Sequence, residues 1–173
     1  MNKNVLYLSL GSNRGDRSGF LNRALEAVSR QIGAITATSP VYQTDPWGFT
    51  DNSPFLNVVA EVETTLDPVQ VLDVILRIER SMGRDRKGAE GRGKGEKAYR
   101  SRTIDIDILF FNDLAVDSPG LVIPHPLIPL RRFVLVPLDA LRPGLVHPVL
   151  RKTVRQLLQE CPDHSAVAGY PQE

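Results

Sequence analysis

Two aspartates in the second half of the chain have a spacing that suits metal binding. The segment Arg102–Leu109 reads RTIDIDIL, and its alternation of polar and apolar residues predicts a strand. Asp105 and Asp107 would then share one face of that strand. Two positions along a strand span about 6.5–7 Å, so both carboxylates can reach one metal ion or a pair of ions. Oxygen ligands favour Mg²⁺ or Mn²⁺ over zinc, and the alternative is a half-exposed strand whose polar face lies in water.

The segment from Arg84 to Arg102 is basic and rich in glycine. It holds eight Lys and Arg residues against three Asp and Glu residues, a net charge of +5 in a chain of net charge +1. Its four glycines indicate a mobile loop over residues 84–101, either a solvated linker or a loop that closes over an anion. Beside a magnesium site, the second alternative indicates a polyphosphate substrate gripped by arginines.

Side chains suited to a flat polar heterocycle lie at the start of another predicted strand. Phe55 and Asn57 flank Leu56, so an aromatic ring and an amide point to the same side. Core packing of Phe55 and a strand-end hydrogen bond of Asn57 are the alternatives. His125 lies between two prolines, where the backbone is extended, and either donates to a phosphate or caps a turn.

Length and composition favour one globular domain. The chain has 173 residues, of which 42% are hydrophobic and 24% charged, and its net charge gives no reason to expect a nucleic-acid or membrane partner. It lacks the run of about 18 apolar residues that a membrane helix requires. Its one cysteine, Cys161, excludes an intrachain disulfide and favours a reducing compartment. We therefore expect a cytoplasmic monomer, with a single domain over residues 1–160 and a C-terminal tail over 161–173.

Hydrophobic periodicity predicts the elements that position these side chains. A helix is expected around Leu21–Ile32, and a second one from its cap at Asp67 to Met82. Together with the strands, they give the order strand, helix, strand, strand, helix, strand. That order predicts an α+β fold, a ferredoxin-like split βαβ sandwich whose antiparallel sheet has helices on one face. The expected strands are Val5–Leu10, Ile35–Gln43, Phe55–Thr64 and Thr103–Phe111, and two further helices are expected at Arg132–Leu141 and Thr153–Glu160.

Short motifs occur in a characteristic order between about Val5 and Leu141. They are LGSN at 10–13, YQTDPWG at 42–48, FLN at 55–57, GRDR at 83–86, RTIDIDI at 102–108, IPHP at 123–126 and RRF at 131–133. Together they resemble the hydroxymethyldihydropterin pyrophosphokinase family of folate biosynthesis. The resemblance implies a ferredoxin-like fold and a Mg²⁺-dependent transfer of the pyrophosphoryl group of ATP to the hydroxymethyl group of a reduced pterin, with release of AMP.

The resemblance also implies roles for individual residues. Asp105 and Asp107 would hold two Mg²⁺ ions and act in catalysis together with Arg84 and Arg86 of the basic loop. Phe55 and Phe133 would stack on the two faces of the pterin. The implied ATP-binding residues are Glu79, Arg84, Arg86, Tyr99, Arg102, Ile108, His125 and Arg131. The implied pterin-binding residues are Thr44, Asp45, Pro46, Trp47, Phe55, Asn57, Asp105 and Phe133.

Two other classes of protein are compatible with parts of the sequence. A ferredoxin-like RNA-binding module would use the basic loop and exposed aromatic side chains. That class gives no reason for Asp105 and Asp107, which would repel phosphate without a metal. An ordinary Mg²⁺-dependent kinase would transfer only the γ-phosphoryl group, so it would release ADP where a pyrophosphokinase releases AMP.

Overall fold

A six-stranded sheet forms the centre of the fold. The structure, a computed structural model, describes residues 2–47, 53–83 and 103–172. Strand β1 (Asn4–Ser12) lies between β4 (Phe55–Thr64) and β5 (Asp105–Phe111). Strands β2 (Ala34–Thr38) and β3 (Tyr42–Thr44) both pair with β4, and β8 (Val167–Gly169) pairs with β3. All these pairings are antiparallel, as the element order predicts.

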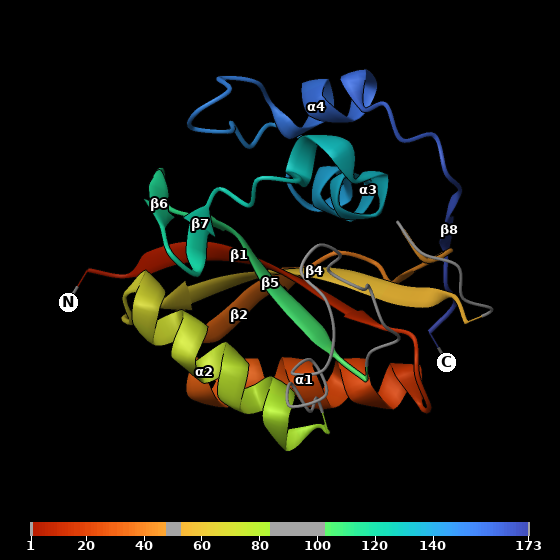
Figure 1. The fold of residues 1–173 in the computed structure, drawn as a ribbon, viewed down its shortest axis with the longest axis horizontal. Helices are drawn as coiled ribbons and strands as arrows, with labels where there is room; N and C mark the ends of the chain where they lie inside the picture. The colour runs from red at the N-terminus through yellow and green to blue at the C-terminus, as the bar shows by residue number, and fades with distance from the viewer. Residues whose placement is uncertain (1, 48–52, 84–102, 173) are drawn as a thin grey trace, which may run out of the picture.

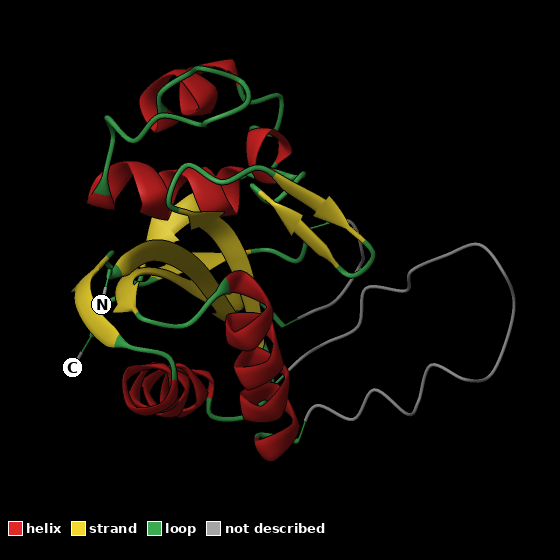
Figure 2. Cartoon of the chain, turned by 90° about the vertical axis from the view of Figure 1, so that its left-hand side faces the viewer, coloured by secondary structure: helices red, strands yellow, loops and turns green. Residues whose placement is uncertain are grey.

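Helices lie on both sides of this sheet. Helices α1 (Arg17–Gln31) and α2 (Pro68–Ser81) cover one face, which is the arrangement expected for the split βαβ unit (Figure 1). Helices α3 (Arg132–Leu141) and α4 (Val154–Glu160) lie over the opposite face and add a third layer (Figure 2). The fold is therefore α+β, and the expectation of helices on one face holds for α1 and α2 only. None of the helices in the described ranges has the length and hydropathy of a transmembrane segment.

The strand expected over Ile35–Gln43 is divided into β2 and β3. The break falls at Ser39-Pro40-Val41, where Pro40 has no N–H group to donate to a neighbouring strand. Ser39 keeps this part of the chain attached to β4, because its N–H donates to the Val59 carbonyl at 2.9 Å and its Oγ accepts from the Val59 N–H at 3.0 Å. The chain can thus bend within the sheet edge without losing its pairing to β4.

Side chains at the helix ends account for three of the four α-helix starts in the part of the chain that the structure describes. Asp67 and Gln70 cap α2 reciprocally, with backbone-to-side-chain distances of 2.8 and 2.9 Å, as predicted from the sequence. Thr153 and Gln156 do the same for α4, and the Asp16 side chain accepts from the Gly19 N–H at the start of α1. Helix α3 differs, because the side chain of its own N-cap residue makes no capping hydrogen bond.

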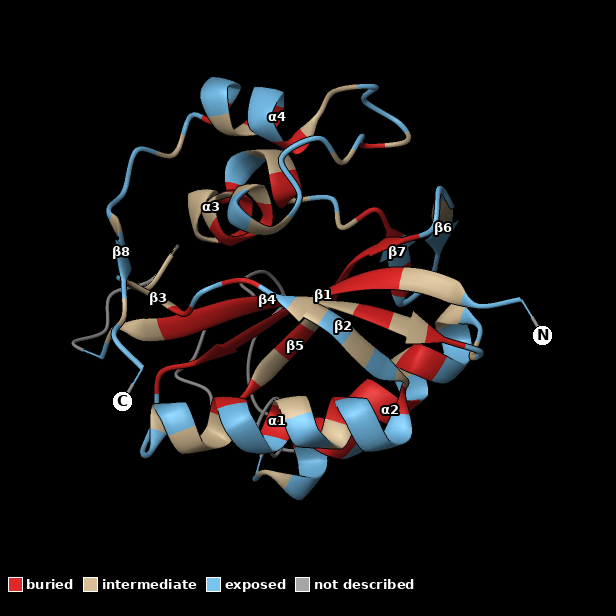
Figure 3. Cartoon of the chain, turned by 180° about the vertical axis from the view of Figure 1, so that it is seen from behind, coloured by how far each residue is buried: buried red, intermediate tan, exposed pale blue. Residues whose placement is uncertain are grey.

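Each central strand serves two apolar clusters, one on each face of the sheet. In β1, the side chains of Leu6, Leu8 and Leu10 pack in the cluster beneath α1 and α2. Tyr7 packs instead in the cluster beneath α3 and α4. The outer faces of the helices remain exposed (Figure 3). Because successive side chains alternate between the faces, a polar residue between two buried leucines must face α3.

The residues after α4 belong to the folded structure. Cys161 is 4% exposed and packs in the second cluster as a small apolar residue. Strand β8 pairs with Tyr42–Thr44, and the Tyr170 N–H donates to the Val41 carbonyl at 2.9 Å. The tail expected over 161–173 therefore contains the outermost strand of the sheet. A three-residue strand is too short to produce a recognisable hydrophobic period, so the sequence pattern did not reveal it.

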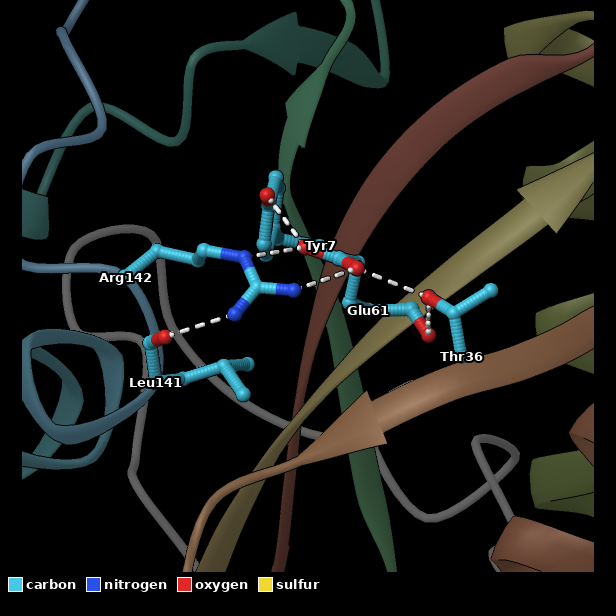
Figure 4. A network of polar contacts seen from close by, with 5 residues as sticks. All are labelled: Tyr7, Thr36, Glu61, Leu141 and Arg142. Atoms are coloured by element: carbon cyan, nitrogen blue, oxygen red, sulfur yellow. Dashed lines mark hydrogen bonds and ion pairs between the residues drawn. The ribbon is translucent and has the colours of Figure 1, made fainter.

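A polar cluster fastens the end of α3 to the sheet (Figure 4). The Glu61 carboxylate accepts from Tyr7 Oη at 2.6 Å, from Thr36 Oγ1 at 2.8 Å, and from Arg142 Nε and Nη2 at 2.9 and 3.0 Å. Burial by itself raises the pKa of Glu61, but these hydrogen bonds outweigh burial and lower it. Burial and the bond to Glu61 raise the pKa of Tyr7 to about 12. The ionised carboxylate thus joins three strands to the segment that follows α3.

Replacing Glu61 with Ala should destabilise the fold, because it leaves the hydroxyl group of the buried Tyr7 without this acceptor. We expect a loss of about 1–3 kcal/mol in the free energy of unfolding, measured by urea denaturation. Glu63→Ala on the same strand is the matched control. Its ion pair with Lys3 joins side chains that are 35% and 68% exposed, so we expect a change within about 0.5 kcal/mol. Equal losses in the two variants would contradict the role given to Glu61.

Candidate active site

Asp105 and Asp107 lie on the face of the sheet that α3 covers. The side chains of Ile106 and Ile108 in β5, and of Ile104 just before it, are buried in the cluster beneath α1 and α2, so the two aspartates point to the other side. Asp105 pairs with Gly11 and Asp107 with Ser9 of the central strand. Both carboxylates are half-buried. The alternation predicted from the sequence is confirmed, although the strand begins at Asp105 and not at Thr103.

His125 is anchored beside this strand. Its N–H donates to the Leu109 carbonyl of β5 at 3.0 Å, and its Nδ1 accepts from the Leu127 N–H at 3.1 Å. Burial and, to a smaller extent, the charge of Arg131 lower the pKa of His125 to about 4, and the charge of Asp105 acts in the opposite direction. The imidazole is therefore neutral at physiological pH, with its proton on Nε2. The two alternatives that the sequence left open are compatible, since Nδ1 caps a turn and Nε2 can donate to a ligand.

Asn57 and Phe55 lie over a glycine of the central strand. Gly11 pairs with Asn57 on one side and with Asp105 on the other, so the three residues form a row across β4, β1 and β5. A Cβ atom on Gly11 would lie 3.0 Å from Asn57 Oδ1 and 3.6 Å from Phe55 Cδ1. Asn57 is 3% exposed and donates through Nδ2 to Thr44 Oγ1 at 2.8 Å. The amide is thereby oriented with Oδ1 over Gly11.

Two aromatic rings and an arginine form a second group on this face. Trp47, in the loop after β3, lies 6.4 Å from Phe133 of α3 between ring centroids, and the ring planes are inclined at 55°. The guanidinium carbon of Arg131 lies 4.9 Å from the Trp47 centroid and 5.5 Å from the Phe133 centroid. Arg131 is 6% exposed, so its charge is held against aromatic faces in a desolvated position. Asp45 and Pro46 lie in the same loop, exposed and half-buried respectively.

Two of the expected ATP-binding residues lie in the opposite layer. Glu79 is 2% exposed on α2, and the Ile108 side chain is buried in the cluster beneath α1 and α2. Any contact of Ile108 with a ligand on the aspartate face would have to come from its backbone. Arg84, Arg86, Tyr99 and Arg102, and with them the basic loop, lie outside the described residues. Within residues 2–47, 53–83 and 103–172, no three His, Cys, Asp or Glu side chains cluster as a metal site. The candidate metal ligands in these ranges are therefore the two carboxylates of Asp105 and Asp107.

Two features of the site were not recognised in the sequence. The strand expected from the sequence ends at Leu10, whereas Gly11 lies inside β1 and leaves room for Phe55 and Asn57. Arg131 was expected to contact phosphate, and the structure shows in addition that its guanidinium packs on Trp47 and Phe133. The first feature could have been recognised, because a glycine that continues an alternating strand often marks a place where another group approaches the backbone closely.

Comparison with known sequences identifies close relatives. Residues 7–143 match the family model described as 7,8-dihydro-6-hydroxymethylpterin-pyrophosphokinase (HPPK). The chain is 42% identical over 145 residues to the 2-amino-4-hydroxy-6-hydroxymethyldihydropteridine pyrophosphokinase of Porphyromonas gingivalis, covering 83% of this chain and 94% of the relative. The identity to the Bacillus subtilis enzyme of the same name is 40% over 137 residues, covering 78% of this chain and 76% of that protein.

Solved structures share the fold. A crystal structure of HPPK-DHPS in complex with substrates superimposes with a TM-score of 0.74 at 16% identity, over 92% of this chain and 43% of that one. Wild-type HPPK-DHPS of Plasmodium falciparum with pteroate gives a TM-score of 0.72 at 22% identity, over 92% and 42%. The chain thus spans less than half the length of these solved proteins. The motifs, the matched residues and the curated relatives agree, and the chain belongs to the 7,8-dihydro-6-hydroxymethylpterin pyrophosphokinase family.

Proposed function

We propose that the face of the sheet beneath α3 is where this chain carries out the reaction of its family. That reaction is the ATP-dependent transfer of a pyrophosphoryl group to hydroxymethyldihydropterin in folate biosynthesis. One observation carries the assignment to this face: the row Asn57–Gly11–Asp105 puts a buried amide and a carboxylate on the two strands that flank β1, on one surface of the sheet. A polar ring held at the amide would have its substituent directed along the row toward the acidic pair.

The pterin is proposed to bind over Gly11. Asn57 Oδ1 is fixed there by the bond from Asn57 Nδ2 to Thr44, so it can accept a hydrogen bond from an N–H group at the ring edge. Phe55 and Phe133 provide the apolar faces, and Trp47 closes the side of the site next to Phe133. The backbone of Thr44, Asp45 and Pro46 is proposed to contact the remaining polar edge.

Asp105 and Asp107 are proposed to hold Mg²⁺, with two ions in the complete site. The donor set fits this metal, because it consists of carboxylate oxygens on one face of a rigid strand. Two like charges at adjacent positions of one strand face repel each other, and a divalent cation relieves that repulsion. When bound, Mg²⁺ would neutralise negative charge on the phosphate oxygens of ATP.

His125 and Arg131 are proposed to contact the phosphates. His125 Nε2–H is a neutral donor whose ring is held by its Nδ1 bond to the Leu127 N–H. The pterin hydroxyl would attack the β-phosphorus in line, so the contribution of these side chains is placement and charge stabilisation. Glu79, Arg84, Arg86, Tyr99, Arg102 and Ile108 stay predictions as ATP-binding residues, and Arg84 and Arg86 as catalytic residues.

We also propose that the chain acts as a monomer in the cytoplasm. The single cysteine, Cys161, is buried in the second cluster and is thus shielded from forming a disulfide with another chain. The near-neutral net charge of +1 supports small-molecule substrates over a nucleic-acid partner.

Asp107→Asn should abolish transfer by removing one of the two proposed metal-binding carboxylates. We expect the rate of AMP formation from ATP and 6-hydroxymethyl-7,8-dihydropterin to fall about a hundredfold or more, with the thermal unfolding midpoint little changed. Asp113→Asn, an exposed position just after β5, is the control and should keep full activity. Undiminished activity of Asp107→Asn would refute the metal role, and ADP as the product of the unmodified protein would indicate an ordinary kinase.

Gly11→Ala should weaken pterin binding because the added methyl group approaches Asn57 Oδ1 to 3.0 Å. Overpacking of this kind costs about 1–3 kcal/mol, so we expect the KM for the pterin to rise about fivefold or more while the KM for ATP stays unchanged. Gly144→Ala is the matched control, since a Cβ there meets nothing within 4 Å. An equal rise in both KM values would place the pterin elsewhere.

Acid should destabilise the protein through His125. Its folded-state pKa of about 4 lies below the ordinary value of 6.5, so the stability linked to the neutral ring is fully present above pH 6.5 and is lost as the pH falls toward 4. The thermal unfolding midpoint should therefore drop over this range. His125→Asn keeps an acceptor for the Leu127 N–H but does not titrate, so its midpoint should fall less steeply. The exposed His164→Asn variant should behave as the unmodified protein does.

A further inference from the structure

We propose that the segment over residues 161–169 is a positioning element of the active site, and that Asp163 is its key residue. The segment contacts the N-terminus of α3 at one end and β3 at the other. This inference rests on the proposed function, because its importance for substrate binding depends on Phe133 and Trp47 lining the pterin site. The segment lies beyond residue 143, where the match to the family model ends.

Asp163 supplies the cap that α3 lacks. The first N–H groups of a helix have no partner within the helix, and Arg131 at the N-cap provides none from its side chain. Asp163 Oδ2 accepts from the Arg132 N–H at 3.2 Å, although the two residues are 31 positions apart. A carboxylate at this end also interacts favourably with the helix dipole. The residues at this helix start are Arg131, Arg132 and Phe133, of which two contact Trp47.

The Asp163 carboxylate is itself held in place. Its other oxygen, Oδ1, accepts from the Ser165 N–H at 3.0 Å and from Ser165 Oγ at 2.6 Å. Burial by itself raises the pKa of Asp163, but the hydrogen bonds from Ser165 and Arg132 outweigh burial and lower it. The side chain is therefore ionised at neutral pH and is oriented by bonds on both oxygens.

The same segment continues into β8, which pairs with β3, the strand that precedes Trp47. Val167 of β8 pairs with Thr44, and Gly169 pairs with Tyr42. Thr44 accepts the bond from Asn57, and the chain reaches Trp47 three residues later. A single stretch of nine residues thus fixes both the start of α3 with Phe133 and the strand that leads to Trp47. The distance between the rings of Phe133 and Trp47 depends on both attachments.

Another carboxylate of α3 provides a matched control. Asp139 accepts from Arg155 Nε and Nη2 of α4 at 2.7 and 3.1 Å. This ion pair also fastens α3 to the C-terminal part of the chain, but it lies two turns away from Phe133. If α3 only needed to be attached, the loss of Asp139 and the loss of Asp163 would have similar effects.

Trp47 is the single tryptophan of the chain, so its fluorescence reports on the packing of Trp47 beside Phe133 without any substrate. In Asp163→Ala we expect the acrylamide quenching constant of Trp47 to rise about twofold and the pterin KM about fivefold, as for the loss of a helix cap, with a smaller change in kcat. Asp163→Asn should return both values part of the way to those of the unmodified protein, since its one amide oxygen can still cap the helix while its NH₂ group cannot accept from Ser165. Asp139→Ala should leave both unchanged.

The two readouts separate this inference from the proposed function. Unchanged quenching in Asp163→Ala, or an equal rise in Asp139→Ala, would overturn the positioning role. A quenching constant that rises in Asp163→Ala and not in Asp139→Ala would support the positioning role even if the pterin were not turned over. The proposed function alone would then fail. If Asp163→Ala does not fold, Ser165→Ala removes the bond from Ser165 Oγ to Asp163 Oδ1 and leaves the backbone N–H bond in place. It should give a smaller rise in the quenching constant, whereas no rise would overturn the proposal.

Discussion

The alternation of side chains along β1, β4 and β5 is the constraint on which both the core and the candidate site depend. Because helices cover both faces of the sheet, every second residue of these strands must be apolar for α1 and α2, and the residues between them are the ones available to α3. A shift of one residue in the β1–β5 pairing would turn Asp105 and Asp107 into the apolar cluster. The isoleucines beside the aspartates therefore fix the register that brings the carboxylates beside Gly11 and Asn57.

Most of the fold could be predicted from sequence patterns of neighbouring residues. The Ile-Asp alternation of β5 and the reciprocal cap of Asp67 and Gln70 are properties of neighbouring residues, so they could be recognised without tertiary information. The side on which Asp105 and Asp107 lie followed from the same alternation. The motifs then connected these positions with the pterin and ATP sites of a family, which composition and spacing alone would not have done.

Interactions between residues far apart in the chain could not be predicted in this way. Glu61 bonds to Tyr7 and Arg142, at separations of 54 and 81 residues, and neither pair has a signature in the sequence. The same holds for Asp163 and Arg132. Strand β8 escaped recognition because three residues, Val167–Gly169, form no period, and their structure depends on the exposed edge of β3.

Helix α3 is the element that these long-range contacts have in common. Arg142 at its C-terminus bonds to Glu61 of the sheet, Asp139 bonds to Arg155 of α4, and the Arg132 N–H at its start bonds to Asp163. A helix of ten residues that carries Phe133 beside its N-terminus would move that ring whenever either end moved. Fixing both ends lets the Phe133, Trp47 and Arg131 group exist before any substrate arrives, so that binding does not have to order these side chains. The conformational entropy lost in ordering this group is compensated during folding by hydrogen bonds outside the site, those of Glu61, Asp139 and Asp163.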